Sequence, residues 1–376
     1  MLKLPEELES FRQAVRAQAN ARVAPLAAMV DREQRYSPEL WAAIRDLEML
    51  QLPFAEDVGG SGGTFLAYVI ATEEVARCSA IAALYPGTTV QVATTILEHG
   101  TSEQVRRFVP PLVAGEHAAA WAFTEPGTGS DPRQIATRAE PVSGGWRLNG
   151  TKAFISYAGH AKEALVFART DERRLGAFLV DTAQPGWQVG TAPKLLSFGG
   201  GEAAEVTLID VEVPDDRVIG DPTKGFDVML SGEAQGKVRA SAICVGIAQR
   251  AVDEAIAYAT TRLHRGVPLA ERFPTVQALL GDMEAGVLAA RAMVRSCADL
   301  LGAGATITKE AAASRLVAGR AARETTSMAM QVCGAYGLTQ DLPLERLYRE
   351  AKFFEVAQGV AEIQKIIVAR QLLAGH

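Results

Sequence analysis

The residues best suited to chemistry lie in one turn, residues 121–131, with the sequence Trp-Ala-Phe-Thr-Glu-Pro-Gly-Thr-Gly-Ser-Asp. The apolar run before the turn is typical of a buried strand and stops at Pro126, which has no backbone donor. Gly127 and Gly129 would let the backbone approach a flat ligand closely, because neither carries a side chain. Hydroxyls stand at the mouth of the turn, on Thr124, Thr128 and Ser130. By itself, such a turn is more typical of a solvated glycine-proline loop than of a ligand site.

A second segment, residues 150–156, has the sequence Gly-Thr-Lys-Ala-Phe-Ile-Ser. The two segments together resemble the Thr-Glu-Pro-x-Ala-Gly-Ser-Asp and Asn-Gly-x-Lys-x-Trp-Ile-Thr motifs of the acyl-CoA dehydrogenase family, with Phe154 for the tryptophan and Ser156 for the last threonine. In that family the residue matching Ser156 donates to flavin N5, and the one matching Thr124 contacts the pyrimidine edge of the ring. A flavin that accepts hydride gains electron density there, so fixed donors lower the barrier. The resemblance therefore implies non-covalently bound FAD.

The resemblance also supplies a second half of the cofactor site. Residues 262–266 resemble the family's Arg-x-x-Phe-Gly, in which the arginine matching Arg262 grips the FAD pyrophosphate of a neighbouring subunit, whereas Arg265 replaces the phenylalanine. Residues 331–337 resemble Gln-x-x-Gly-Gly-x-Gly, which meets the dinucleotide across the interface. Such a shared site implies at least a dimer, and the family norm implies a homotetramer. The cofactor-binding candidates are Trp121, Phe123, Thr124, Gly129, Ser130, Phe154, Ser156, Arg262, Arg265, Gln331, Gly334, Ala335, Val360 and Glu362.

The position of the catalytic base departs from the family pattern. Dehydrogenation of an acyl thioester needs a carboxylate that removes the α-proton, and the family usually supplies it in Tyr-Glu-Gly-Thr-x-Glu-Ile-Gln. Here Gln358 occupies that position, and the alternative position on the first bundle helix is Gly236. A primary amide accepts no proton at neutral pH, and losing a general base costs roughly 10²–10⁴ in rate. Glu233 and Glu355 are the remaining catalytic candidates, although each is more typical of a solvated helix residue.

The substrate side also departs from the family. Residues 194–201 carry glycines where the family has Lys-x-x-Gly-x-Arg-x-Ser, so the serine that helps to hold the acyl-pantetheine chain is missing from its expected place. Lys237 stands for an arginine often found beside the base. The substrate-binding candidates are Ser130, Gly236, Lys237 and Gly359. The departures cluster around the substrate and not around the flavin, which suggests altered substrate or altered chemistry.

Three kinds of element must position these residues. Residues 1–115 show helical patterns, with Ser37 before Pro38 as an N-cap and a capping box that starts at Thr101 and opens a helix ending by Pro110 and Pro111. The glycine-rich stretch 58–63 follows no alternating strand, so it is better explained as a connector than as a dinucleotide fingerprint.

Short alternating or apolar runs fill residues 116–222 and predict an antiparallel, β-barrel-like middle domain. Residues 143–145 and the pair Asn149-Gly150 supply hairpin-type turn signals. Apolar stripes at helical spacing return in residues 223–376 and predict a four-helix bundle, whose first helix would be roughly 50 Å long. This order of helical, β and helical domains is that of the acyl-CoA dehydrogenase fold, an α+β multi-domain architecture.

Composition narrows the remaining possibilities. The chain has 376 residues, of which 48% are hydrophobic and 22% charged, with a net charge of −6 and no basic run interleaved with aromatics, so we expect no nucleic-acid partner. Its four cysteines are far apart, which favours reduced thiols in the cytoplasm over a disulfide or metal site. The first 22 residues resemble no signal peptide, and no stretch looks apolar for long enough to insert into a membrane.

Three functions fit these observations. The leading one is an FAD-dependent oxidoreductase of the CH–CH group of an acyl thioester, carried on CoA or an acyl carrier protein, with an electron-acceptor flavoprotein or oxygen as partner. The second is a flavin-dependent monooxygenase on the same fold, which needs no α-proton base. The third is a non-catalytic subunit of a mixed tetramer. The acyl chain, its carrier and the net reaction stay open at this point.

Overall fold

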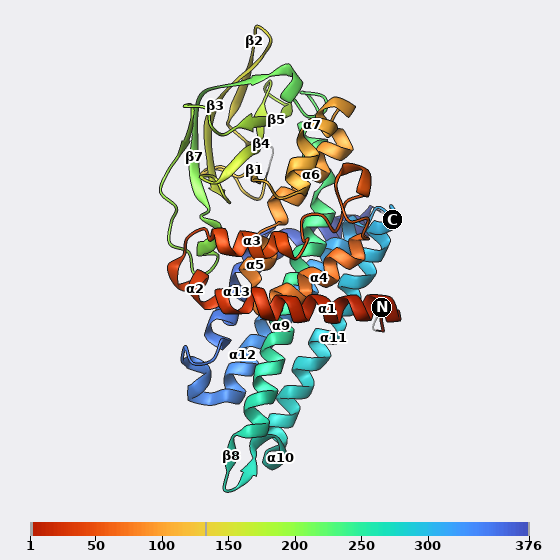
Figure 1. The fold of residues 1–376 in the computed structure, drawn as a ribbon, viewed down its shortest axis with the longest axis vertical. Coiled ribbons are helices and arrows are strands. Elements are labelled where there is room, and N and C mark those ends of the chain that lie inside the picture. The colour runs from red at the N-terminus through yellow and green to blue at the C-terminus, as the bar shows by residue number, and fades with distance from the viewer. Residues whose placement is uncertain (1–2, 132–133, 375–376) are drawn as a thin grey trace.

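A computed structural model describes residues 3–131 and 134–374. A helical N-terminal part is followed by a curled sheet and then by long helices that extend away from the sheet (Figure 1). The N-terminal helices are α1 (Glu6–Arg22), α2 (Ala24–Glu33), α3 (Pro38–Asp46), α4 (Phe65–Cys78), α5 (Ala80–Leu84), α6 (Gly87–His99) and α7 (Ser102–Val113). The strands of the sheet are β1 (Ala118–Ala122), β2 (Arg138–Val142), β3 (Gly145–Ile155), β4 (Ala161–Arg169), β5 (Leu175–Asp181), β6 (Trp187–Val189) and β7 (Ala204–Pro214).

The C-terminal part is built from long helices. They are α8 (Gly225–Ser231), α9 (Glu233–Thr261), α10 (Leu269–Arg272), α11 (Pro274–Gly302), α12 (Thr308–Cys333), α13 (Leu344–Val356) and α14 (Ala361–Leu373). A small hairpin of β8 (Leu263–His264) and β9 (Val267–Pro268) lies at the far tip of the bundle (Figure 1). Helix α9 has 29 residues, which corresponds to about 43 Å, somewhat shorter than the sequence pattern predicted.

Local signals set several helix ends. The Ser37 hydroxyl accepts from the backbone of Leu40 at 3.1 Å, and the capping box at Thr101 forms with both of its hydrogen bonds, so both caps are confirmed. The predicted end at Pro110 and Pro111 is wrong, since α7 continues to Val113. Burial of the residues after the prolines in the core outweighs the lost backbone bonds.

The sheet has the strand order β1-β4-β2-β3-β7-β6, with β5 paired to β4. The hairpin between β2 and β3 turns at Gly144, as predicted, but Asn149-Gly150 lies inside β3 and not in a turn. A side chain at Gly150 would meet Thr137 at 2.6 Å, so the glycine permits a close approach of backbone. The sheet is also mixed, since β1 runs parallel to β4, whereas the sequence pattern predicted antiparallel strands throughout.

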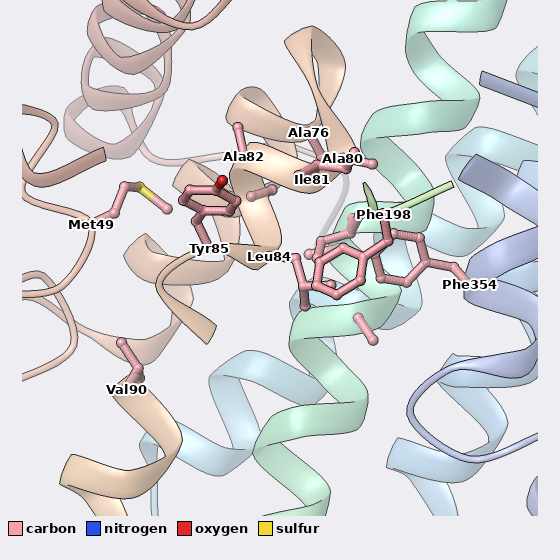
Figure 2. Packing of buried hydrophobic residues seen from close by; sticks show 14 of the residues in the cluster. Met49, Ala76, Ala80, Ile81, Ala82, Leu84, Tyr85, Val90, Phe198 and Phe354 are labelled. Atoms are coloured by element: carbon pink, nitrogen blue, oxygen red, sulfur yellow. The ribbon is translucent and has the colours of Figure 1, made fainter. Parts of the chain in front are cut away.

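A continuous core joins the three parts of the chain. Figure 2 shows Leu84 of the N-terminal part near Phe198, from the loop after β6, and near Phe354 of α13. Phe198 also stacks on Phe353 with ring centroids 5.0 Å apart. This packing fixes the end of α13, and with it the following loop that carries Gln358.

One segment, Ala80–His99, is apolar and long enough to span a membrane, contrary to the expectation from the sequence. It is broken into α5 and α6, and 78% of its most apolar window is buried inside the protein. Core helices pass the same test of length and composition, so this segment is weak grounds for membrane insertion.

Candidate active site

The turn after β1 is closed by its own backbone. Glu125 and Thr128 exchange two backbone hydrogen bonds, of 2.9 and 3.1 Å, around Pro126 and Gly127. The Thr128 hydroxyl forms a hydrogen bond inside the turn, where it donates to the carbonyl of Asp131 at 2.6 Å. Of the three hydroxyls named from the sequence, Thr124 and Ser130 therefore remain at the surface of the turn for a ligand.

A buried ion pair fastens this turn to β3. The Lys152 ammonium is fully buried and donates to the Glu125 carboxylate at 2.8 Å and to the Phe167 carbonyl at 2.7 Å. Burial lowers the pKa of Lys152 to about 8, although the negative charge of Glu125 acts in the opposite direction. The Glu125 carboxylate also accepts from the backbone of Thr137 at 3.0 Å. The two matching segments are thus joined by residues that sequence analysis did not select, although a lysine inside an apolar strand was a visible signal.

A backbone hydrogen bond completes the junction, from Ala153 to the carbonyl of Thr124 at 2.8 Å. At the end of β3, Phe154 adopts a left-handed conformation with φ of 56° and leaves 62% of its surface exposed. Ser156 follows it and is half-buried, as are Trp121, Phe123 and Thr124. The junction thus combines an exposed aromatic side chain with two half-buried hydroxyl residues, which suits a flat heteroaromatic ligand.

The residues predicted for the second half of the cofactor site lie elsewhere. Arg262 ends α9 and Arg265 forms the tip of the β8–β9 hairpin, at the end of the bundle remote from the sheet (Figure 1). Gln331, Gly334 and Ala335 lie at the end of α12 and in the short turn η5 (Gly334–Leu338).

The end of α9 and the turn η5 are in contact through the rings of Tyr258 and Tyr336, whose centroids are 6.1 Å apart. All five predicted residues are exposed. The structure therefore keeps the two predicted halves of the site apart within one chain, as a site shared between subunits requires.

The two predicted base positions meet in space. A Cβ atom added to Gly236 on α9 would lie 3.3 Å from Oε1 of Gln358, so both positions face the same point and neither carries a carboxylate. Gln358 has φ of 57° and Gly359 has φ of 86°, and this left-handed pair turns the chain between α13 and α14. Val360 and Glu362 follow at the start of α14.

The two alternative carboxylates are engaged with lysines. Glu233 accepts from Lys237 at 2.7 Å, one turn along α9, and Glu355 accepts from Lys352 at 2.8 Å. The hydrogen bond from Lys352 lowers the pKa of Glu355, which makes this carboxylate a weaker proton acceptor. Lys237 is buried and forms an ion pair with Glu233, so its charge is already neutralised within the protein.

The glycines of residues 194–201 have a structural reason. Gly199, Gly200 and Gly201 form the buried turn η3, and a Cβ at Gly201 would come within 2.1 Å of the Phe198 ring. The Gly200 carbonyl accepts from the Tyr85 hydroxyl at 2.7 Å, and the Gly201 carbonyl from the backbone of Tyr157 at 2.9 Å. The segment therefore packs against the N-terminal helices directly behind Ser156.

Comparison with known proteins identifies the family. Models of the acyl-CoA dehydrogenase N-terminal, middle and C-terminal domains match residues 5–116, 120–211 and 223–373. The short-chain specific acyl-CoA dehydrogenase of Bos taurus mitochondria is 34% identical over 100% of this chain and 92% of its own length. The chain belongs to the acyl-CoA dehydrogenase family. It is an acyl-CoA dehydrogenase-like oxidoreductase and a flavoprotein, which confirms the family and the enzyme class predicted from the sequence.

Other relatives show how wide the similarity is. The acryloyl-CoA reductase (NADH) of Anaerotignum propionicum is 32% identical over 98% of this chain and 95% of its own. Butyryl-CoA dehydrogenase from Megasphaera elsdenii superposes with a TM-score of 0.95 at 30% identity, covering 99% of both chains. A glutaryl-coenzyme A dehydrogenase in complex with glutaryl-CoA superposes with a TM-score of 0.95 at 29% identity, covering 100% of this chain and 97% of the other. The acyl-CoA dehydrogenase fold predicted from the sequence is thereby confirmed.

Proposed function

We propose that this flavoprotein is an FAD-dependent oxidoreductase of the CH–CH group of an acyl thioester, carried by CoA or an acyl carrier protein. The observation that carries the proposal is the junction of the turn after β1 with the end of β3. The Ala153–Thr124 hydrogen bond and the Lys152–Glu125 ion pair bring Thr124, Phe154 and Ser156 to one accessible face. Relatives named for short-chain acyl-CoA and butyryl-CoA support a short acyl chain.

The residues present fit a flavin. Phe154 offers an exposed ring, the hydroxyls of Thr124 and Ser156 are accessible, and a Cβ at Gly127 would meet no atom within 4 Å. When bound, FAD would supply a two-electron acceptor. The Ser156 and Thr124 hydroxyls would donate hydrogen bonds that fix the orientation of the ring. The exposed arginine Arg262 of a neighbouring copy would neutralise the pyrophosphate.

Gln358 has a different capability from the usual base. Its side-chain amide donates hydrogen bonds and would orient a thioester carbonyl oxygen, but it cannot remove the α-proton. A flavin-dependent monooxygenase is the second candidate for this reason, since Gln358 and Gly236 both lack a carboxylate. Oxygen consumption coupled to NADH-reduced flavin would select the monooxygenase, and bleaching of the flavin by acyl-CoA without oxygen would select the dehydrogenase. For the dehydrogenase the proposed acceptor is an electron-transferring flavoprotein or oxygen.

The assembly proposed is a homotetramer, because the β8–β9 hairpin with Arg262 and Arg265 lies at the far tip of the bundle, away from the sheet that carries Thr124 and Ser156 (Figure 1). Large apolar side chains are exposed near the tip of the bundle, among them Leu338 at 72% and Leu263 at 55%, and a neighbouring copy would cover them. We also propose a cytoplasmic location from the four free, buried cysteines.

The test of this proposal uses Arg262. We expect heat-released cofactor to be identified as FAD by chromatography, and light scattering to give a tetramer. Arg262→Met should weaken FAD binding by roughly tenfold or more, because a phosphate loses its charged donor. Arg173→Met removes an exposed arginine from the loop between β4 and β5; it is the matched control and should bind FAD normally. Release of FMN, or an FAD-loaded monomer, would overturn the proposal.

A further inference from the structure

Arg239 is a buried cation without an anion. It lies on α9 three residues after Gly236 and is only 3% exposed. Its Nη1 donates to the carbonyl of Gly87 at 2.8 Å, and the other hydrogen-bonding group recorded against its guanidinium among the described residues is the neutral phenol of Tyr68. No described carboxylate forms an ion pair with it. A buried charge that lacks a partner is costly, so a fold that keeps one normally provides an anion for it.

A glycine and two tyrosines surround the Arg239 side chain. A Cβ at Gly87 would lie 3.1 Å from the guanidinium, so glycine at that position makes room for the side chain. The hydroxyl of Tyr157 is buried without a partner among the described residues, the hydroxyl of Tyr68 interacts with Arg239, and burial raises the pKa of both phenols, so both stay neutral. The positive charge of Arg239 opposes that rise in both. A guanidinium and two neutral phenols thus lie together in one buried place, with no anion among the described residues.

This place adjoins the site of reaction. Arg239 and Gly236 line the same recess, together with Phe65, Tyr68, Val90 and Gln91. Residues three apart on a helix share a face and lie roughly 4.5 Å apart along its axis. Gly236 also faces Gln358, and Tyr157 follows Ser156 directly in the chain. A group that reaches Arg239 therefore starts from the space between the predicted base position and the flavin contact.

Water does not supply the missing negative charge. The recess has room for about one water molecule, which can accept hydrogen bonds from the guanidinium but leaves its charge without an anion. Gly236, which lines the recess, also faces the half-buried side chain of Gln358 on the loop between α13 and α14, so a ligand would reach Arg239 past this side chain. A carboxylate has the matching chemistry, because its two oxygens accept from Nε and Nη2 side by side.

We propose that Arg239, with Tyr68 and Tyr157, binds a carboxylate at the far end of the acyl chain, so that the substrate is a short ω-carboxyacyl thioester. The inference rests on the proposed function, since it places an acyl thioester in this site. The separation of about one helical turn between Gly236 and Arg239 favours a short chain over a long one.

The experiment compares ligands that differ only in the terminal charge. Calorimetry on the FAD-loaded protein, without oxygen, measures the Kd of glutaryl-CoA against its monomethyl ester, and of succinyl-CoA against butyryl-CoA. The acid of each pair should bind at least roughly tenfold more tightly. In Arg239→Met this preference should vanish while the neutral ligands still bind, and Arg239→Lys should retain part of it.

A matched control and three results decide the matter. Arg295→Met removes another buried arginine, from α11, which lies outside the recess and should leave the preference intact. Equal affinities within each pair in the unmodified protein, or a preference that survives in folded Arg239→Met, would overturn the inference alone. Binding of no thioester at all would overturn the proposed function and the inference with it. The comparison of ligands on the unmodified protein holds even where Arg239→Met does not fold.

Discussion

Replacing Gln358 by glutamate should create ordinary acyl-CoA dehydrogenation. The two side chains have the same shape, and Gln358 already has a left-handed backbone, so the change adds charge without new strain. Oε1 of Gln358 lies 3.3 Å from the position of a Cβ on Gly236, which places the new carboxylate where both base positions of the family meet. A general base is worth roughly 10²–10⁴ in rate, equivalent to about 3–5 kcal/mol of barrier.

The structure favours the lower end of that range. Arg315 donates to the carbonyl of Ala357 at 2.9 Å, so its positive charge lies close to residue 358 and lowers the basicity of a carboxylate there. Partial burial acts in the opposite direction and should raise the apparent pKa above about 4.3. We therefore expect about 10²-fold faster reaction near neutral pH, which is lost as the pH falls through that pKa.

The assay is bleaching of the flavin without oxygen by short and medium acyl-CoA thioesters, in the unmodified protein and in Gln358→Glu. Glu233→Gln and Glu355→Gln are the matched controls, because both carboxylates are paired with lysines and should leave the rate unchanged. Rapid bleaching by unmodified protein that persists in both control variants would mean that the base lies elsewhere. Loss of that bleaching in either control would identify the base directly and refute the reasoning from Gln358.

Two further predictions concern buried charges. Lys152→Met should reduce the free energy of unfolding, measured in urea, by about 3–5 kcal/mol, because it leaves Glu125 buried without its partner. The double variant Lys152→Met with Glu125→Gln should restore part of this stability. A loss under about 1 kcal/mol, roughly the value of a surface pair, would contradict this role of Lys152. Burial raises the pKa of Glu350 to about 7, so stability should fall as the pH rises from about 4.5 to about 7. Glu350→Gln should then be more stable by up to about 3 kcal/mol at pH 8 and little changed at pH 4.5, and an equal effect at both would show that the charge is not involved.

The parts of the fold that follow from local chemistry were predictable. The caps at Ser37 and Thr101 need only residues three apart in sequence, and the stripes of α9, α11 and α12 repeat over many turns. Failures came where distant packing decides. The glycine of Asn149-Gly150 serves a close contact with Thr137 inside a strand, and no turn signal distinguishes the two uses.

The site was predictable to the extent that it is encoded in contiguous motifs. Thr124 and Ser156 belong to two such motifs, and the structure brings their segments together. The pairing of Gln358 with Gly236 depends on α9 and on the loop between α13 and α14, which lie more than 100 residues apart in the chain, so the sequence shows both positions without showing that they face each other. Arg239 carries no signal at all, because an arginine on a helix is ordinarily solvated.

The neutral base positions and the unpaired cation are linked by electrostatics. A carboxylate at residue 236 would lie three residues from Arg239 on the same helix face, at a spacing where such pairs form, and one at residue 358 would share the same space. Either would offer Arg239 an internal anion and weaken its hold on a substrate carboxylate. Glycine and glutamine leave the guanidinium free. Gln358→Glu should therefore raise the rate with butyryl-CoA and, in the same protein, reduce the binding preference for glutaryl-CoA over its monomethyl ester. A preference unchanged by the new carboxylate would mean that Arg239 and residue 358 act independently.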